Sequence, residues 1–314
     1  MTTQRGFTLI ELAIVLVIVT ILIGGLAVPL SAQIQARRIA ETNRTLEEAR
    51  EAIMGYAMSH IASPPSTCTC VYKADTTLNT PDAPPDTSDD PDSTCPISLC
   101  PTTGTATLTL PIARHYLPCP DLNGVDPEPN LDNDGVGGLT DLNNGVEDRR
   151  PGTPVGSPYV AGVTCAASSS DPASSTGNLP WVTLGSAAQD AWGNRLRYMV
   201  TASFADSSTG FSSTNTGNLQ VCSASGCAVV NVAGNVPAVL VSYGPNGWGG
   251  RNINGNTLAA PTSADELENT NADGNFVSRS PTQVGNASGE FDDLVKWISD
   301  SLLKNRVCPA GGCP

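Results

Sequence analysis

The most restrictive feature of this sequence is an apolar run near its N-terminus that contains one carboxylate. Residues 7–30 are almost entirely apolar, apart from two threonines and Glu11. As an α-helix, a segment of this length would extend about 36 Å, which is enough to cross the hydrocarbon core of a bilayer. Leu30 stands where a signal peptidase would need a small residue. We therefore predict a transmembrane helix that stays with the chain.

The residues in front of the run resemble the processing site of the type IV pilin family, which includes the pseudopilins of type II secretion. A short polar leader, residues 1–6, ends in Gly6, and Phe7 begins the sequence Phe-Thr-Leu-Ile-Glu. In that family a membrane aspartyl peptidase cuts after the glycine and methylates the new N-terminal residue. The resemblance implies that Phe7 is the first mature residue and Glu11 the fifth, where the family keeps its glutamate.

A carboxylate within hydrocarbon needs a partner. Near the bilayer centre it costs about 3 kcal/mol on insertion scales, so such groups persist when they are paired. After cleavage, the amine of Phe7 on one subunit could neutralise Glu11 of a neighbour and set the axial register, while the aliphatic faces of the helices pack together. The alternative is a single-pass anchor whose Glu11 reaches towards the membrane interface.

A second, amphipathic stretch continues this helix. Ile39, Leu46 and Ile53 recur every seven residues, and charged side chains occupy other faces. One helix over residues 7–60 would be about 80 Å long, with residues 7–30 in lipid or in a filament core and the remainder against a globular head. The sequence therefore predicts a stalk that carries a head.

The rest of the chain divides by composition. Residues 61–118 are rich in Cys and Pro and have no apolar period, so we interpret them as an insertion loop, irregular over residues 62–101. Residues 119–152 are rich in Asp and Asn. Residues 153–314 contain short apolar runs separated by Gly, Asn, Ser and Pro, which predicts a β-rich head followed by a helix and a tail. The fold class is α+β, with the long helix packed on an antiparallel sheet that carries long, disulfide-stapled loops.

The predicted strands of the head are residues 159–165, 181–184, 196–204, 219–222, 228–232 and 238–243. A helix is predicted after residues 288–290, because apolar residues from Phe291 to Leu302 fit one helical face. Two stretches of the head resemble major pseudopilins and related proteins: DAWGNRLRY at residues 190–198, where a Trp-Gly-Asn turn feeds a strand, and SYGPNG at residues 242–247.

Ten cysteines in loop-like sequence indicate disulfides formed outside the cytoplasm, with reduced structural cysteines as the alternative. Three pairs each enclose four residues, which favours local bridges between Cys95 and Cys100, Cys222 and Cys227, and Cys308 and Cys313. The other four allow three pairings. A bridge between Cys68 and Cys70 would be strained, so we favour the pairings that join these two to Cys119 and Cys165.

Residues 130–141 are similar to an EF-hand calcium loop. Oxygen-bearing side chains fall at the first, third, fifth and twelfth positions, with glycine sixth and a backbone carbonyl available at the seventh. The candidate ligands are Asn130, Asp132, Asp134, Val136 and Asp141. Further candidates in the same region are Asp121, Asn123, Asp126, Asn143 and Asp148. The alternative is a solvated loop of Asx turns. Pseudopilins and some pilins hold calcium in head loops, so the resemblance implies the same cofactor.

The remaining chemistry in the sequence points away from catalysis. Only two histidines are present, His60 and His115, and neither has zinc-like spacing. Nucleophile elbows, phosphate-binding loops and dinucleotide fingerprints do not occur, so we predict no catalytic residues. A formal net charge of −14 argues against nucleic acid and anionic lipid as partners.

We interpret the chain as a pilin, the structural subunit of a type IV pilus-like filament. It would be a homo-oligomer that is served by prepilin peptidase and assembly machinery, held in the bacterial inner membrane before assembly and extracellular after it. The alternatives are a pseudopilin in a periplasmic pseudopilus of type II secretion, and a monomeric, membrane-anchored, calcium-dependent binding module.

Overall fold

The structure is a computed structural model that describes residues 8–62, 65–70, 106–111, 114–122, 144–150, 164–165, 174–308 and 313. Side chains are described at all of these except residues 22–30, 65–70, 106–111, 150 and 164. In chain order the elements are α1 (Leu9–Ser59), β1 (Ile61–Ala62), β2 (Pro65–Cys70), β3 (Ala106–Pro111), β4 (Arg114–His115), β5 (Arg149–Arg150), β6 (Thr164–Cys165), β7 (Ser174–Asn178), α2 (Trp181–Leu184), β8 (Arg197–Thr201), α3 (Ala202–Ala205), β9 (Leu219–Cys222), β10 (Ala233–Val236), β11 (Ala238–Ser242), α4 (Ala264–Glu268), β12 (Asn275–Val277), β13 (Leu294–Ile298) and α5 (Asp300–Val307).

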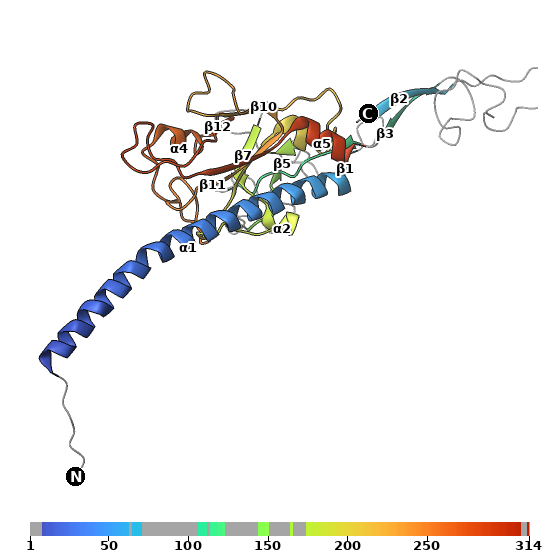
Figure 1. Cartoon of the computed structure of the whole chain (residues 1–314). Coiled ribbons are helices and arrows are strands. Elements are labelled where there is room, and N and C mark those ends of the chain that lie inside the picture. The colour runs from blue at the N-terminus through green and yellow to red at the C-terminus, as the bar shows by residue number, and fades with distance from the viewer. Residues whose placement is uncertain are drawn as a thin grey trace, which may run out of the picture.

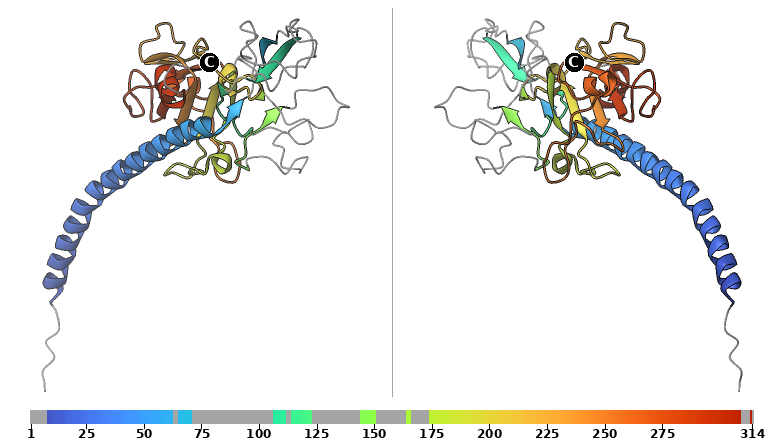
Figure 2. Two further views of the ribbon diagram at one scale, coloured as in Figure 1. Left: turned by 90° about the vertical axis from the view of Figure 1, so that its right-hand side faces the viewer. Right: turned by 90° about the vertical axis from the view of Figure 1, so that its left-hand side faces the viewer.

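The helix α1 is the stalk. Its C-terminal half lies along the head, whereas its N-terminal half projects away from the head and curves (Figures 1 and 2). The predicted amphipathic stripe is confirmed, because Leu46 and Ile53 are fully buried and Ile39 is half-buried. The end of α1 is fixed to the head by Tyr56, whose hydroxyl donates to Oε1 of Glu147 at 2.6 Å.

The projecting half of α1 is apolar and uncovered, since every described side chain from Leu9 to Ile21 is exposed. Among the described residues, no helix combines the length and the apolar character that crossing a membrane requires. The predicted span also includes residues 22–30, whose side chains lie outside the description.

A four-stranded antiparallel sheet in the order β13-β11-β8-β7 forms the centre of the head. Side chains of β8 and β11 alternate between its two faces, as strand geometry requires. Tyr198 and Leu240 pack in one core with the buried residues of α1 and α5. Met199 and Val241 pack in a second core, against the three-stranded sheet β10-β9-β12. The central strands are therefore apolar on both faces.

Several predictions about the head are correct and others are wrong. Strands β9 and β11 lie within the predicted ranges 219–222 and 238–243. The run 196–204 is a strand only as far as Thr201, where α3 begins. The pairing is not wholly antiparallel, because β12 runs parallel to β9. The stretch expected to be irregular, residues 62–101, contains the strand β2, which pairs with β3 of the same insertion.

Three predicted elements are wrong in type or place. Residues 181–184 form the single helical turn α2 and not a strand. This turn ends at Gly185, whose backbone adopts the left-handed conformation typical of a helix C-terminus. The predicted strand at residues 228–232 is absent, and β10 begins at Ala233. The helix expected from Phe291 is instead β13 followed by α5.

The disulfides partly follow the spacing. Cys222 is bonded to Cys227, and Cys308 to Cys313. The predicted bridges that join Cys68 and Cys70 to Cys119 and Cys165 are wrong. Cys119 and Cys165 are bonded to each other, with their Cα atoms 5.3 Å apart. Both lie in the core beside α1, which brings them together although 46 positions separate them in sequence. The side chains of the four remaining cysteines lie outside the description: Cys68, Cys70, Cys95 and Cys100.

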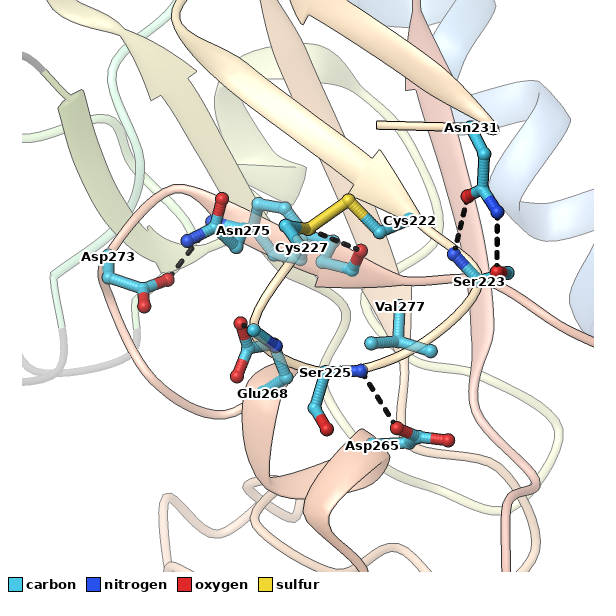
Figure 3. Close-up of a disulfide and its surroundings, with 12 residues drawn as sticks. Cys222, Ser223, Ser225, Cys227, Asn231, Asp265, Glu268, Asp273, Asn275 and Val277 are labelled. Atoms are coloured by element: carbon cyan, nitrogen blue, oxygen red, sulfur yellow. Dashed lines mark hydrogen bonds between the residues drawn. A yellow bond between two sulfur atoms is a disulfide. The ribbon is translucent and has the colours of Figure 1, made fainter. Parts of the chain in front are cut away.

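Figure 3 shows the bridge between Cys222 and Cys227, which closes a short loop at the end of β9. Two amides of this loop are held by carboxylates of α4. Ser225 N donates to Asp265 Oδ1 at 2.9 Å, and Gly226 N donates to Glu268 Oε1 at 3.1 Å. The loop is thus fixed by covalent and hydrogen bonds together.

Candidate functional site

The start of α1 carries the first candidate site. Thr8 and Glu11 form a capping box, in which both the backbone nitrogen and the hydroxyl of Thr8 donate to Glu11 Oε2 at 2.8 Å. The Glu11 amide in turn donates to Thr8 Oγ1 at 3.4 Å. Within one chain, the carboxylate of Glu11 therefore already has local donors at the helix N-terminus. Gly6 and Phe7, the predicted processing residues, lie outside the described residues.

The two head stretches that resemble pseudopilins meet at one side chain, Asp190. Its Oδ1 accepts hydrogen bonds from the amides of Trp192 and Asn194, both at 2.9 Å, so the Trp-Gly-Asn turn closes around it. Its Oδ2 accepts from the hydroxyl of Ser242 at 2.7 Å. The adjoining amide of Ala191 donates to the hydroxyl of Thr42 on α1 at 3.2 Å. This turn consequently joins the stalk to the end of β11.

The chain after Ser242 makes a tight turn that supports a cluster of acidic residues. Gly244 has φ of +58°, and a Cβ there would lie 2.4 Å from Oδ1 of Asp292, so only glycine fits. The cluster consists of Glu266 from α4 with Asp292 and Asp293, which precede β13. One carboxylate oxygen from each lies within 4.8 Å of the others. Three side chains from two distant segments of the sequence thus converge.

Each carboxylate of this cluster is held through one oxygen, while its other oxygen has no partner among the described residues. Glu266 Oε1 accepts from the amide of Asp292 at 3.0 Å, and Asp292 Oδ2 accepts from the amide of Asn246 at 3.3 Å. Asp293 Oδ2 accepts from Nδ2 of Asn269 at 2.9 Å. The opposite oxygens are buried and unpaired: Glu266 Oε2, Asp292 Oδ1 and Asp293 Oδ1.

Charge repulsion and burial both act on these three groups. Burial raises the pKa of Asp292 to about 7, with a further contribution from the charge of Glu266. Burial also raises the pKa of Glu266 and holds that of Asp293 well above its usual range. Ionised together, they would leave uncompensated negative charge in the interior, which is costly.

A divalent cation would resolve this arrangement. Hard carboxylate oxygens are the ligands that Ca²⁺ prefers, and its coordination shell is completed by carbonyls and water. The amide groups that donate to the hydrogen-bonded oxygen of each carboxylate orient these side chains, as outer-shell groups do in metal sites. The donor set therefore fits a calcium ion better than a transition metal, because it contains no nitrogen or sulfur ligand.

The calcium loop predicted from the sequence is separate from this cluster in the chain. Its ligands Asn130, Asp132, Asp134, Val136 and Asp141 lie outside the described residues, as do Asn123, Asp126 and Asn143.

Asp121 and Asp148, which flank that loop, are described and come together. Asp121 is fully buried, and its Oδ2 accepts from the amide of Gly145 at 3.0 Å. Burial, reinforced by the charge of Asp148, raises the pKa of Asp121 to about 8. Asp148 accepts a hydrogen bond from the amide of Leu122. Hydrogen bonds from backbone amides to these two carboxylates thus join the segment before the acidic loop to the segment after it.

Sequence reasoning missed both the capping box and the acidic cluster. The capping box has a local signature, because Thr8 and Glu11 stand three residues apart at the start of an apolar run. The cluster has almost none. Asp292 and Asp293 are adjacent in sequence, but nothing local indicates that Glu266 lies beside them.

Comparison with known proteins gives one finding. Residues 1–27 match the prokaryotic N-terminal methylation motif, the signature of prepilin-type proteins, which are type IV pilins and pseudopilins. This motif implies processing by a prepilin peptidase and handling by an assembly machinery. No curated protein and no solved structure gives a significant match to the chain.

Proposed function

We propose that this chain is a pilin, the structural subunit of a type IV pilus-like extracellular filament, and that it has no catalytic role. The observation that carries the proposal is the methylation motif at the start of a long apolar stalk whose first turns project uncovered from the head. Exposed aliphatic surface of this extent requires a membrane before assembly and neighbouring subunits after it.

In this proposal Glu11 has two successive partners. In a single chain it caps α1 through Thr8. After cleavage, the methylated amine of Phe7 on an adjacent subunit would approach it and neutralise its charge within the apolar bundle. The capping box holds the carboxylate at the helix end, where that amine would arrive.

The test combines processing with assembly. Mass spectrometry of the mature protein should find a methylated N-terminus at Phe7. The variant Glu11→Ala should be processed but absent from filaments that are sheared from cells. Glu41→Ala is the matched control, because Glu41 is an exposed acidic residue further along the same helix and should leave assembly intact. A mature chain that still begins at Met1, or normal filaments of Glu11→Ala, would refute the proposal.

A pseudopilin of type II secretion is the second candidate. It is favoured by the Asp190 turn, since the two stretches that resemble major pseudopilins form one hydrogen-bonded unit. Location separates the candidates. A pilus is recovered outside the cell by shearing, whereas a pseudopilus stays in the periplasm and its loss blocks secretion of exported enzymes. A monomeric, membrane-anchored, calcium-dependent binding module would be indifferent to Glu11→Ala.

We further propose calcium as the cofactor of the head. The support comes from Glu266, Asp292 and Asp293, which bring one carboxylate oxygen each to within 4.8 Å of one another. Each of the three also has one buried oxygen without a partner among the described residues. The ion would join α4 to the segment before β13 and so fix the long connection between β11 and β13. The loop at residues 130–141 stays a second predicted calcium site.

A further inference from the structure

A groove opens where the stalk first meets the head. It has a volume of about 600 Å³ and runs between α1, the chain segment before β13 and the loop that contains Pro281 and Val284. Ile39 of α1 forms one wall, while Phe291 and Leu294 contribute to the other. Most of this surface is apolar, and Val284 is 78% exposed. The single chain leaves this apolar surface in water.

The lining of the groove also includes acidic side chains. Glu290 is one of them and is only half-buried, yet it has no ion-pair partner among the described residues. An occupant that combines an aliphatic side chain with a cation would match this surface.

The stalk of the same protein carries such a combination. Ile34, Arg37 and Arg38 have the i, i+3, i+4 spacing that places side chains along one strip of a helix. All three are exposed, Ile34 to 46%, and neither arginine has an ion-pair partner in the described part of the chain. Arg37 lies about 200° around the helix from Gln35, which lines the groove of its own chain, so it faces away from its own head.

We propose that this groove receives the strip Ile34, Arg37 and Arg38 from the stalk of a second copy, with an arginine paired to Glu290 and Ile34 against the apolar wall. The inference rests on the proposed filament and names one of its contacts. Because groove and strip are different surfaces of one chain, the contact is heterologous and propagates from copy to copy. Contacts of this type generate open helical assemblies when the rotation does not close.

Cross-linking between two differently tagged full-length copies tests the contact. One copy carries Gln283→Cys in the groove and the other carries Arg37→Cys, and both are expressed together and oxidised in cells. A disulfide-linked heterodimer is expected, at least fivefold more abundant than with the control pair Val229→Cys and Arg37→Cys, because Val229 is exposed outside the groove. Equal yields from the two pairs would overturn the contact.

A charge exchange tests the ion pair in the same assay. With the cysteine reporters moved to Gln283→Cys and Ile34→Cys, Glu290→Arg in one copy should reduce the heterodimer at least fivefold, and Arg37→Glu with Arg38→Glu in the other should restore it. Arg44→Glu, a reversal at another exposed stalk position, should not restore it. Rescue by Arg44→Glu, or no loss with Glu290→Arg, would overturn the proposal.

Electron microscopy of sheared material keeps this inference separate from the proposed function. Filaments without the specific cross-link would refute the groove contact and leave the pilin proposal standing. A cross-link without filaments would support the groove contact between copies and refute the pilin proposal.

Discussion

Removing one carboxylate from the acidic cluster should abolish the stabilisation that calcium gives to the head. The variant is Asp293→Asn, which keeps the size of a buried side chain and still offers an oxygen to Asn269. It removes one of the three charges that attract the cation. The protein to be measured is a soluble fragment that begins near residue 31, so that the apolar half of the stalk is absent.

The magnitude follows from mass action. At a calcium concentration of 100 times Kd, a ligand that binds only the folded state raises the free energy of unfolding by about 2.7 kcal/mol. For a domain of this size each kcal/mol moves Tm by roughly 2–4 °C. The wild-type fragment should therefore melt roughly 5–10 °C higher in calcium than in chelator. Asp293→Asn should lose most of this difference when melting is followed by calorimetry.

The pH dependence has a definite sign. The pKa of Asp292 is about 7 in the folded chain, against 3.8 for an ordinary aspartate, so the folded state holds this proton more tightly than the unfolded state. Without calcium, the contribution of Asp292 to stability is complete below pH 3.8 and is lost as pH rises to about 7. Calcium replaces the proton, so its effect on Tm should grow over the same interval.

Asp121, with a raised pKa of about 8, shifts stability in the same direction, as do Glu266 and Asp293, whose pKa values burial also raises. A variant must therefore isolate the contribution of Asp292. Asp292→Asn should reduce the fall in apo-protein stability between pH 4 and 7 but leave the part caused by Asp121, Glu266 and Asp293. Asp273→Asn is the matched control at an exposed acidic residue. A calcium-dependent rise in Tm that is unchanged in Asp293→Asn would refute a site at the cluster and direct attention to residues 130–141.

Three further predictions concern the stability of the same fragment, measured by guanidinium unfolding. Replacing Cys119 and Cys165 together by alanine should cost about 4 kcal/mol and replacing Cys222 and Cys227 about 2 kcal/mol, because the closed loops span 46 and 5 positions; equal losses would contradict the loop-entropy argument. Asp190→Ala should cost about 3 kcal/mol, since it strands two amides and a hydroxyl, and a loss below 1 kcal/mol would show that the turn closes without it. Leu46→Ala should cost about 2–5 kcal/mol and Val182→Ala, at an exposed position, below about 0.5 kcal/mol; similar values would mean that α1 does not pack as described.

The elements that the sequence predicts well are those whose apolar pattern has one interpretation. Leu46 and Ile53 recur at a helical period among charged residues, and they are the buried stripe of α1. The short runs of β9 and β11 are bounded by turn residues and fit no helix. By contrast, the apolar residues of the segment after Phe291 suit a helix as well as a strand. Pairing with β11 decides in favour of the strand, since β13 completes its hydrogen bonds.

The candidate site escaped prediction because its residues owe their positions to the sheet and not to their neighbours in sequence. Asp292 and Asp293 stand at the start of β13, whose register is fixed by pairing with β11 from Leu294 to Ile298. The turn after β11 carries Gly244 and Asn246, so the same pairing brings this turn beside the two aspartates. Glu266 arrives separately, on α4. A site built by strand pairing is visible in sequence only as isolated acidic residues, which solvated surfaces also contain. Its distinguishing property is that one oxygen of each carboxylate is buried without a partner among the described residues, and only the folded chain reveals that.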